Sequence, residues 1–533
     1  MRKRNLYFLL IFLSLTVFFS GCSHPEKKDM NVLFISLDTV RYDHIDTGKG
    51  AKAYTPELRR FSQSSIVFEN AFSTSSETLS SHLSVLTSRF PHELGVYGNE
   101  HKYDGRYRMI QQVFEESGYS TAAIISLGTL ASATGIRTGF QEFREDLFEE
   151  DIFYVPAARI TQEAGRMIEE LKNTRFFLFV HYSDPHTPYA PPNVEGHFEI
   201  ALDGKLIADF NPYQGSILRK TLPLQKGSHV IDFKVKSDFE DFQHFIVRRL
   251  EMSEGCVGDA QNLEFSKELY EGSFIMRDPK SKMKIRCEQN GDVEIFQIIP
   301  ILKKKAALKY YREEVEYLDS SLGLFLRSLE KSGLLKKTAV VIFGDHGEGH
   351  GERERFFGHT RFLNRQFIQV PFIMHLPGME GKRFSSPVSL IGITPTILEY
   401  LGIRDKKFNP EESLLKEIKK GRAKDRTIFS FAFAPSAKTN KLSIIKWPYQ
   451  AIFYLEEDRL KKREVYNFAL SQSYTQSDAL QEEVIRKTAN HYHKIFQRHF
   501  KHFRRIFSPS ASSKKITDKE MLEKLKALGY VDK

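Results

Sequence analysis

The stretch Asn31-Val-Leu-Phe-Ile-Ser-Leu-Asp38 is an apolar run that ends in a carboxylate, and Ala339-Val-Val-Ile-Phe-Gly-Asp345-His346 repeats the pattern much later in the chain. A continuous Val, Ile, Leu and Phe run of this length is typical of a strand buried on both faces, in a parallel sheet covered by helices. Sheets of this kind hold ligands at the carboxyl ends of their strands. The sequence therefore predicts an α/β fold with acidic side chains at one edge of the sheet.

Asp38, Asp345 and His346 are candidate metal ligands. Carboxylate and imidazole groups bind divalent cations, and two neighbouring strand ends would bring them to one point. An Asp after a strand can also be an ordinary turn or helix cap, and for Asp38 alone this alternative stays open. For Asp345 and His346 the metal interpretation is favoured, because Gly344 and Gly347 on either side allow a tight backbone turn.

The length of the chain and its net charge narrow the possible domain organisations and binding partners. A chain of 533 residues is too long for one ordinary core, so a large α/β domain with smaller units is expected. The net charge of +10 could suggest nucleic acid, but the basic residues are interleaved with 68 acidic ones and form no stripe. We expect no nucleic-acid partner, and an anionic substrate or a lipid surface fits the charge at least as well.

The first residues predict export. Arg2-Lys3-Arg4 is a positive segment, residues 6–19 are apolar, and Ser20-Gly21-Cys22 supplies small residues for cleavage. A Cys after the small pair resembles the lipobox of bacterial lipoproteins, with Phe19 where Leu is usual. The resemblance implies that 1–22 is a lipoprotein signal with its lipobox. It also implies lipid anchoring at Cys22 in the bacterial cell envelope, on the periplasmic or outer face. An uncleaved anchor or a plain signal peptide are the alternatives.

Two further cysteines, Cys256 and Cys287, follow in the rest of the chain. In an oxidising compartment they could form a disulfide. They could equally be two separate buried thiols, and the sequence leaves both possibilities open.

Hydroxyl side chains stand just before the helical pattern Leu79, Leu83 and Leu86. A hydroxyl at a helix N-terminus faces unsatisfied amide donors and the positive end of the dipole, which suits attack on a tetrahedral anion. Hydroxyls are also ordinary N-caps. The segment that contains Thr78 is therefore either a nucleophile site or a helix start.

Four blocks, in this order along the chain, resemble the sulfatases of the alkaline phosphatase superfamily. The blocks are a first metal strand at 31–44, a nucleophile signature at 78–89, an Asp-Pro-His block at 179–189 and a second metal strand at 344–348. The resemblance implies an alkaline-phosphatase-like three-layer α/β/α sandwich. It covers most of the chain outside one insertion.

The nucleophile signature departs from the family pattern. Thr78 stands at the nucleophile position, Ser81 at the motif Ser and His82 at the motif Arg, while Ser80 replaces a Pro and Ser88 a Gly. Sulfatases of this family need a Cys or Ser that is oxidised to formylglycine, which a Thr cannot become. A Thr here resembles the phosphoethanolamine and glycerophosphate transferases of the superfamily, in which the hydroxyl binds the metal and takes the phosphoryl group.

The resemblance implies one divalent metal ion held by Asp38, Thr78, Asp345 and His346. Coordination to a cation lowers the pKa of a hydroxyl and makes it a nucleophile. The imidazole of His346 favours Mn or Zn over Ca or Mg, which suit oxygen ligands better.

Besides His346, five histidines in or near the matched blocks are candidates for substrate contact. The resemblance implies that His186 contacts the oxyanion or the leaving group, and His359 could protonate the leaving oxygen. We predict substrate-side roles for His82, His181 and His350 as well, with a structural histidine as the alternative in each case.

The spacing of the blocks predicts the domain organisation. Short alternating runs separated by turn signals indicate an antiparallel β-sandwich inserted in a loop. It could bind a glycan, another substrate or a partner protein, or serve only for packing. The predicted units are the catalytic domain in two parts, 30–193 and 303–403, the all-β insertion 194–302, a small C-terminal α+β subdomain 404–470 and a helical tail 471–533.

Together these features predict a metal-dependent hydrolase or transferase acting on sulfate or phosphate esters through Thr78. The alternative is a catalytically degenerate sulfatase-fold protein that binds an anionic glycan or lipid. Metal content would distinguish them, because a binding protein has little need of a ligand set such as Asp38, Asp345 and His346.

Overall fold

The computed structural model describes residues 28–468 apart from short gaps, together with 490, 491, 494, 496 and 514–517. The gaps are 48–53, 148–153, 188, 190, 193, 195, 212–219, 237–240, 267–272, 353–356, 361, 423, 434–439 and 457–458. The predicted lipoprotein signal 1–22 and most of the predicted helical tail lie outside the described residues. No helix within the described part combines the length and the apolar character that a membrane crossing requires.

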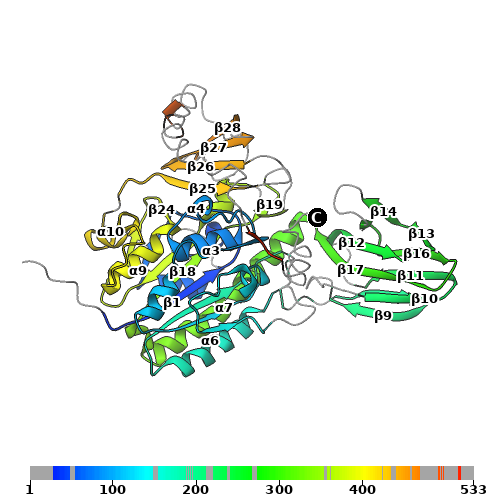
Figure 1. Ribbon diagram of the computed structural model, residues 1–533, viewed down its shortest axis with the longest axis horizontal. Coiled ribbons are helices and arrows are strands. Elements are labelled where there is room, and N and C mark those ends of the chain that lie inside the picture. The colour runs from blue at the N-terminus through cyan, green and yellow to red at the C-terminus, as the bar shows by residue number, and fades with distance from the viewer. Residues whose placement is uncertain are drawn as a thin grey trace, which may run out of the picture.

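A mixed eight-stranded sheet forms the centre of the catalytic body, in the order β23-β2-β22-β18-β1-β7-β5-β6 (Figure 1). The two apolar runs that end in carboxylates are β1 and β18, which pair in parallel. Every residue of both strands is buried, as expected for strands covered on both faces. The strands of this sheet are β1 (Asn31–Leu37), β2 (Ile66–Phe68), β5 (Ser120–Ile124), β6 (Glu142–Arg144), β7 (Phe176–Tyr182), β18 (Thr338–Gly344), β22 (Phe372–His375) and β23 (Lys382–Phe384).

Helices cover both faces of this sheet and create two hydrophobic cores. Val32 and Phe34 point into one core with α3, α5 and α9, while Leu33 and Ile35 point into the other with α2, α6 and α7. This alternation along β1 confirms the predicted three-layer α/β/α sandwich. The helices are α2 (Pro56–Ser62), α3 (Thr78–Thr87), α4 (Pro91–Leu94), α5 (Ile110–Glu116), α6 (Ala157–Leu171), α7 (Lys304–Lys331), α8 (Arg365–Ile368), α9 (Ile393–Leu401) and α10 (Leu415–Lys420).

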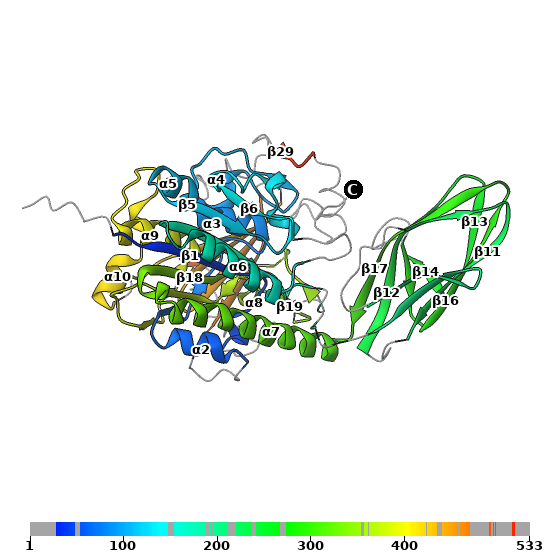
Figure 2. The ribbon, with the colours of Figure 1, turned by 90° about the horizontal axis from the view of Figure 1, so that it is seen from below.

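The insertion consists of two five-stranded antiparallel sheets, with the strand orders β10-β17-β12-β15-β14 and β13-β16-β11-β8-β9. It lies beyond the N-terminal end of α7 (Figure 2). Its core continues into that helix, because Tyr310 and Tyr311 belong to the same buried cluster. The strands are β8 (Phe198–Leu202), β9 (Lys205–Phe210), β10 (Lys220–Leu224), β11 (Gly227–Val235), β12 (Phe242–Met252), β13 (Cys256–Gln261), β14 (Leu263–Ser266), β15 (Ser273–Met276), β16 (Lys280–Cys287) and β17 (Gly291–Leu302).

A disulfide joins Cys256 to Cys287 within the insertion. The two residues are direct partners in the register of β13 with β16, which brings their Cα atoms to 4.1 Å. This pairing settles the question that the sequence leaves open, because strand register brings two distant cysteines face to face.

A four-stranded antiparallel sheet, in the order β25-β26-β27-β28, forms the small C-terminal subdomain. Its first strand contacts the segment before α3: the Phe431 amide donates to Thr74 O at 2.8 Å, and Ser430 Oγ donates to Ser73 O at 2.6 Å. The inserted β domain and this subdomain complete the predicted fold class. The strands are β25 (Ile428–Ala432), β26 (Asn440–Lys446), β27 (Tyr449–Glu456) and β28 (Arg459–Asn467).

Candidate metal centre and active site

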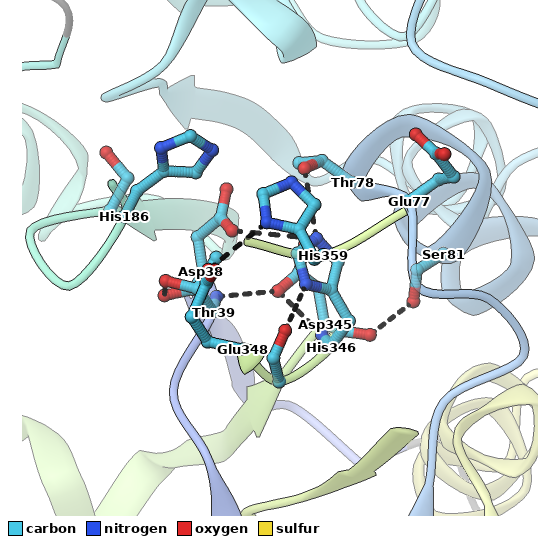
Figure 3. Close-up of polar contacts among 12 residues, drawn as sticks. Asp38, Thr39, Glu77, Thr78, Ser81, His186, Asp345, His346, Glu348 and His359 are labelled. Carbon is cyan, nitrogen blue, oxygen red and sulfur yellow. Dashed lines mark hydrogen bonds and ion pairs between the residues drawn. The ribbon is translucent and has the colours of Figure 1, made fainter. Parts of the chain in front are cut away.

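The topology of the sheet brings two acidic side chains together. Leu37 pairs with Gly344 in the parallel register of β1 with β18, so Asp38 and Asp345 leave the sheet side by side. Asp38, Asp345 and His346 each offer a ligand atom, and these atoms all lie within 4.8 Å of one another (Figure 3). All three residues are fully buried.

The buried carboxylates carry unsatisfied oxygens. Both oxygens of Asp38 and Oδ2 of Asp345 have no hydrogen-bond partner among the described residues. The other oxygen of Asp345 accepts the His346 amide at 2.7 Å and the Thr39 amide at 3.2 Å. Buried polar atoms are almost always paired, so these orphaned oxygens fit a cation. Asp38 lies in a turn, but its side chain caps no turn or helix in the described chain, so a capping role does not explain this carboxylate.

Burial and mutual repulsion act on both acids. Burial raises the pKa of Asp38 well above its usual value, and nearby Glu348 raises it further. Burial likewise raises the pKa of Asp345, and the Asp38 charge adds to that shift. A divalent cation would offset the cost of ionising two buried carboxyls, because an opposite charge favours the ionised form of each.

The tautomer of His346 is set by its backbone. Its Nδ1 donates to Gly347 O at 3.0 Å, which leaves Nε2 with a lone pair. That Nε2 lies 3.4 Å from Asp345 Oδ2 and 3.8 Å from Asp38 Oδ1. Burial, followed by the neighbouring His359, lowers the pKa of His346 well below its usual value, so the ring is neutral and suited to bind a metal.

Thr78 is the first residue of α3, and its hydroxyl points to the metal ligands. Thr78 Oγ1 lies 3.2 Å from His346 Nε2 (Figure 3). Glu77, not Thr78, is the N-cap residue, and the side chain of Asn99 accepts the Leu79 amide of the first turn at 2.9 Å. Ser81, one turn later, donates to Asp345 O at 2.7 Å and ties the helix to the second metal strand. The helix-start alternative therefore does not account for the position of the Thr78 hydroxyl.

Close packing, not a turn, explains the glycine after His346. Neither Gly344 nor Gly347 has a positive φ. A Cβ at Gly347 would instead lie 2.0 Å from Gln366 O, which leaves no room for a side chain. A left-handed residue does occur at Ser88, the C-cap of α3 with φ 54°, where the family signature has Gly.

His186 and His359 lie next to the ligand group. The ring centroids of His359 and His346 are 4.4 Å apart, and those of His186 and His359 are 5.0 Å apart. His359 Nδ1 lies 3.2 Å from Glu348 Oε2, and His186 Nδ1 donates to Thr187 O at 2.6 Å. Burial lowers the pKa of each histidine to about 3. Both rings are therefore neutral and lie beside the ligand group.

His82 and His181 lie behind the carboxylates. His82 Nδ1 donates to Thr78 O and its Nε2 accepts from Ser36 Oγ, both at 2.7 Å. His181 Nε2 lies 3.3 Å from Asp38 Oδ2, and its Nδ1 lies 3.0 Å from Ser126 Oγ. Both rings are fully buried. These contacts orient Thr78 and Asp38, and the predicted substrate contact of the two rings stays a prediction.

For His350, too, the predicted substrate contact stays a prediction. It lies in a short bridge, β19 (Gly349–His350), paired with β20 (Phe357–Gly358). Its ring packs against Tyr311, with centroids 4.3 Å apart, and its Nδ1 lies 3.1 Å from Arg41 Nη1. Because these neighbours enclose the ring, it forms part of the wall beside the site.

Several residues of the site were not predicted as such. Glu348 reaches His359, and buried Arg41 donates to Glu348 O at 3.2 Å. Glu77 is buried beside Thr78, and burial, with Glu100, raises its pKa well above the usual value. Arg41 follows Asp38 closely in the sequence, and Glu348 follows His346. This closeness to the candidate ligands is the sequence signal that could have identified both residues.

A pH-dependent prediction arises at Asp184, just past β7. Its Oδ1 accepts the Ala157 amide at the start of α6 at 2.8 Å, and burial raises its pKa to about 7. An acid whose pKa is raised on folding stabilises the fold below its unfolded pKa, and that contribution is lost as pH rises towards 7. We expect Asp184→Asn, which keeps the acceptor, to gain on the order of 4 kcal/mol relative to the natural chain between pH 4 and 8. Urea unfolding of both proteins across this range measures the difference, and a pH-independent difference would contradict it.

Comparisons with known proteins show which sequences this chain resembles. The family model described as Sulfatase matches residues 30–403. The chain is 24% identical over 407 residues to the N-acetylglucosamine-6-O-sulfatase of Bacteroides thetaiotaomicron, covering 72% of this chain and 70% of that protein. A segment of 105 residues is 31% identical to lipoteichoic acid synthase 2 of Bacillus subtilis, covering 18% of this chain and 16% of that protein.

Solved structures show the same fold. A phosphonate monoester hydrolase from Silicibacter pomeroyi matches with a TM-score of 0.58 and 15% identity, over 91% of this chain and 97% of that one. A protein solved with its substrate D-glucosamine-2-N,6-O-disulfate matches with a TM-score of 0.59 and 15% identity, over 91% of this chain and all of that one.

Proposed function

The chain belongs to the sulfatase family, and on that basis we propose that it is a metal-dependent enzyme that cleaves or transfers sulfate or phosphate esters through Thr78. One observation carries the proposal. The Thr78 hydroxyl lies 3.2 Å from the unprotonated nitrogen of His346, beside two buried carboxylates with unpaired oxygens. A nucleophile, a ligand set and a helix N-terminus meet at this point.

A phosphate ester fits Thr78 better than a sulfate ester. Threonine cannot be oxidised to the aldehyde that the family's sulfatases use, so its own hydroxyl must attack. Support for the phosphoryl version also comes from the local likeness to lipoteichoic acid synthase 2 and from the fold shared with a phosphonate monoester hydrolase. The N-acetylglucosamine-6-O-sulfatase relative supports a glycan as one possible carrier of the ester.

In the proposed reaction, the metal ligands and Thr78 have separate roles. A divalent cation held by Asp38, Asp345, His346 and Thr78 would lower the pKa of the hydroxyl and offset the negative charge of the ester. The Thr78 hydroxyl gives its proton to solvent, its oxygen forms a bond to phosphorus, and the bond to the leaving oxygen breaks as that oxygen takes a proton. Water or an acceptor hydroxyl then takes the phosphoryl group and regenerates Thr78.

His359 is best placed to give a proton to the leaving oxygen. Its Nδ1 lies 3.2 Å from Glu348 Oε2, and burial raises the pKa of Glu348 well above its usual value, so this buried pair holds a proton that can pass to the leaving oxygen. His186 lies beside it, and because its Nδ1 donates to Thr187 O, its Nε2 can accept a hydrogen bond from the hydroxyl of the departing group. The mixed oxygen and nitrogen ligand set favours Mn or Zn.

The test is turnover of an aryl sulfate, an aryl phosphate and an aryl phosphodiester by a soluble form that lacks residues 1–22. Each is measured after metal removal and after addition of Mn, Zn, Mg or Ca. We expect phosphoester cleavage that depends on Mn or Zn. Sulfate cleavage without phosphoester cleavage would contradict the phosphoryl assignment, and a protein that holds no stoichiometric metal would favour the binding-protein alternative.

We also propose that the protein is a lipoprotein of the bacterial envelope. The disulfide between Cys256 and Cys287 supports an oxidising compartment. Radiolabelled palmitate should label the natural chain in its bacterial host, and Cys22→Ser should abolish the label. Equal labelling of both forms would contradict the anchor.

A further inference from the structure

The turn that carries the first metal ligand has an unfavourable backbone. Thr39, directly after Asp38, has φ 58°, in the left-handed region that β-branched residues rarely adopt. Its own hydroxyl donates to Asp38 O at 2.7 Å. A conformation of this kind persists only where its surroundings hold it in place.

One buried phenol holds this turn on both sides. The Tyr311 hydroxyl donates to Thr39 O at 2.8 Å and accepts the Arg41 amide at 2.9 Å. The two hydrogen bonds bracket the residue with positive φ, so the phenol stabilises the left-handed conformation. Tyr311 is fully buried, and the Tyr189 ring packs beside it with centroids 5.6 Å apart.

Tyr311 also belongs to the core of the insertion. It lies in the second turn of α7, which starts two residues after β17 ends at Leu302. Its side chain is part of the same buried cluster as Phe233, Phe245 and other core residues of the β-sandwich. The packing of the sandwich against α7 therefore helps to fix the position of the Tyr311 hydroxyl relative to the turn at residues 38–41.

We propose that Tyr311 is a positioning residue for the metal site, which acts through the Asp38 turn and links the insertion to that turn. It lies outside the ligand set, so its effect reaches the cation only through the backbone of residues 39–41. This inference rests on the metal site of the proposed function. It gives the insertion a structural role at the site even if the sandwich binds no ligand.

The test replaces only the hydroxyl, as Tyr311→Phe in the full mature chain. Mn²⁺ or Zn²⁺ is titrated into chelator-treated protein by calorimetry, and we expect the affinity to fall by about 10- to 100-fold. Hydrogen–deuterium exchange of peptides covering residues 38–44 should become faster, because the Arg41 amide loses its acceptor.

Tyr310→Phe is the matched control. Tyr310 precedes Tyr311 in the same helix and the same core, but its hydroxyl donates to Asp241. It should keep the natural metal affinity and the natural exchange rate over residues 38–44. Natural behaviour of Tyr311→Phe in both measurements, or equal changes in Tyr310→Phe, would overturn the inference. If the unmodified chain binds no cation, the proposed function fails, and the exchange measurement alone decides the role of Tyr311.

Discussion

Thr78→Ala is expected to lower turnover of the best ester substrate by at least about a thousandfold, the scale seen when an enzyme loses its activated nucleophile. The hydroxyl is fully buried and directed at His346 Nε2, and no other role of this side chain is visible among the described contacts. Alanine is a strong helix former, so α3 should form as before. Steady-state kinetics with the metal that supports the highest activity gives the comparison.

Two variants accompany this measurement. Thr78→Ser keeps a hydroxyl at the same position and should retain much more activity than the alanine form. Thr87→Ala removes a hydroxyl at the other end of the same helix, where it donates to Leu83 O at 2.6 Å, and should leave turnover near that of the natural chain. Turnover that survives in Thr78→Ala would assign the attack to another group.

Asp345→Asn is expected to have two opposite effects, a loss of metal binding and a gain in the stability of the metal-free protein. Burial and the nearby Asp38 charge both disfavour the ionised carboxyl of Asp345. The amide keeps Oδ1 as acceptor for the His346 and Thr39 amides and removes one of two buried like charges. We expect the free energy of unfolding of the metal-free protein to rise by on the order of 1–3 kcal/mol at pH 7.

The metal response gives the second half of the test. The natural chain should gain about 2.7 kcal/mol when the free metal is at about one hundred times its Kd, and Asp345→Asn should gain almost nothing. Asp319→Asn is the control, since Asp319 is a buried acid outside the site whose oxygens accept the Glu57 and Leu58 amides. That variant should keep the full metal response. Lower stability of metal-free Asp345→Asn would mean that its carboxylate is favourable even without a cation.

The central sheet and the candidate metal ligands were predictable because their signals are local. An unbroken apolar run shows that β1 and β18 are buried on both faces, and a carboxylate after each run points to the ligand edge of the sheet. The helix α3, with hydroxyl side chains at its start, followed from the spacing of three leucines. These features need no knowledge of distant contacts.

Other features depend on contacts between distant segments. The phenol of Tyr311 meets a turn that lies 272 residues earlier, and nothing in the helical pattern shows which turn it faces. His82 shares a face of α3 with Thr78, but only the packing of that helix on the sheet directs its ring to Ser36. The disulfide likewise follows from strand register, which the alternation of apolar residues does not specify.

The contact between β25 and the segment before Thr78 makes the candidate site depend on the C-terminal subdomain. Ser430 bonds to a carbonyl 357 residues earlier, and the Phe431 amide bonds to Thr74 O in the segment that leads into Thr78. A strand far along the chain thus holds the backbone before α3. A fragment that ended before β25 would keep every candidate ligand and still lack this support, so the sulfatase-like body alone is not a self-sufficient unit.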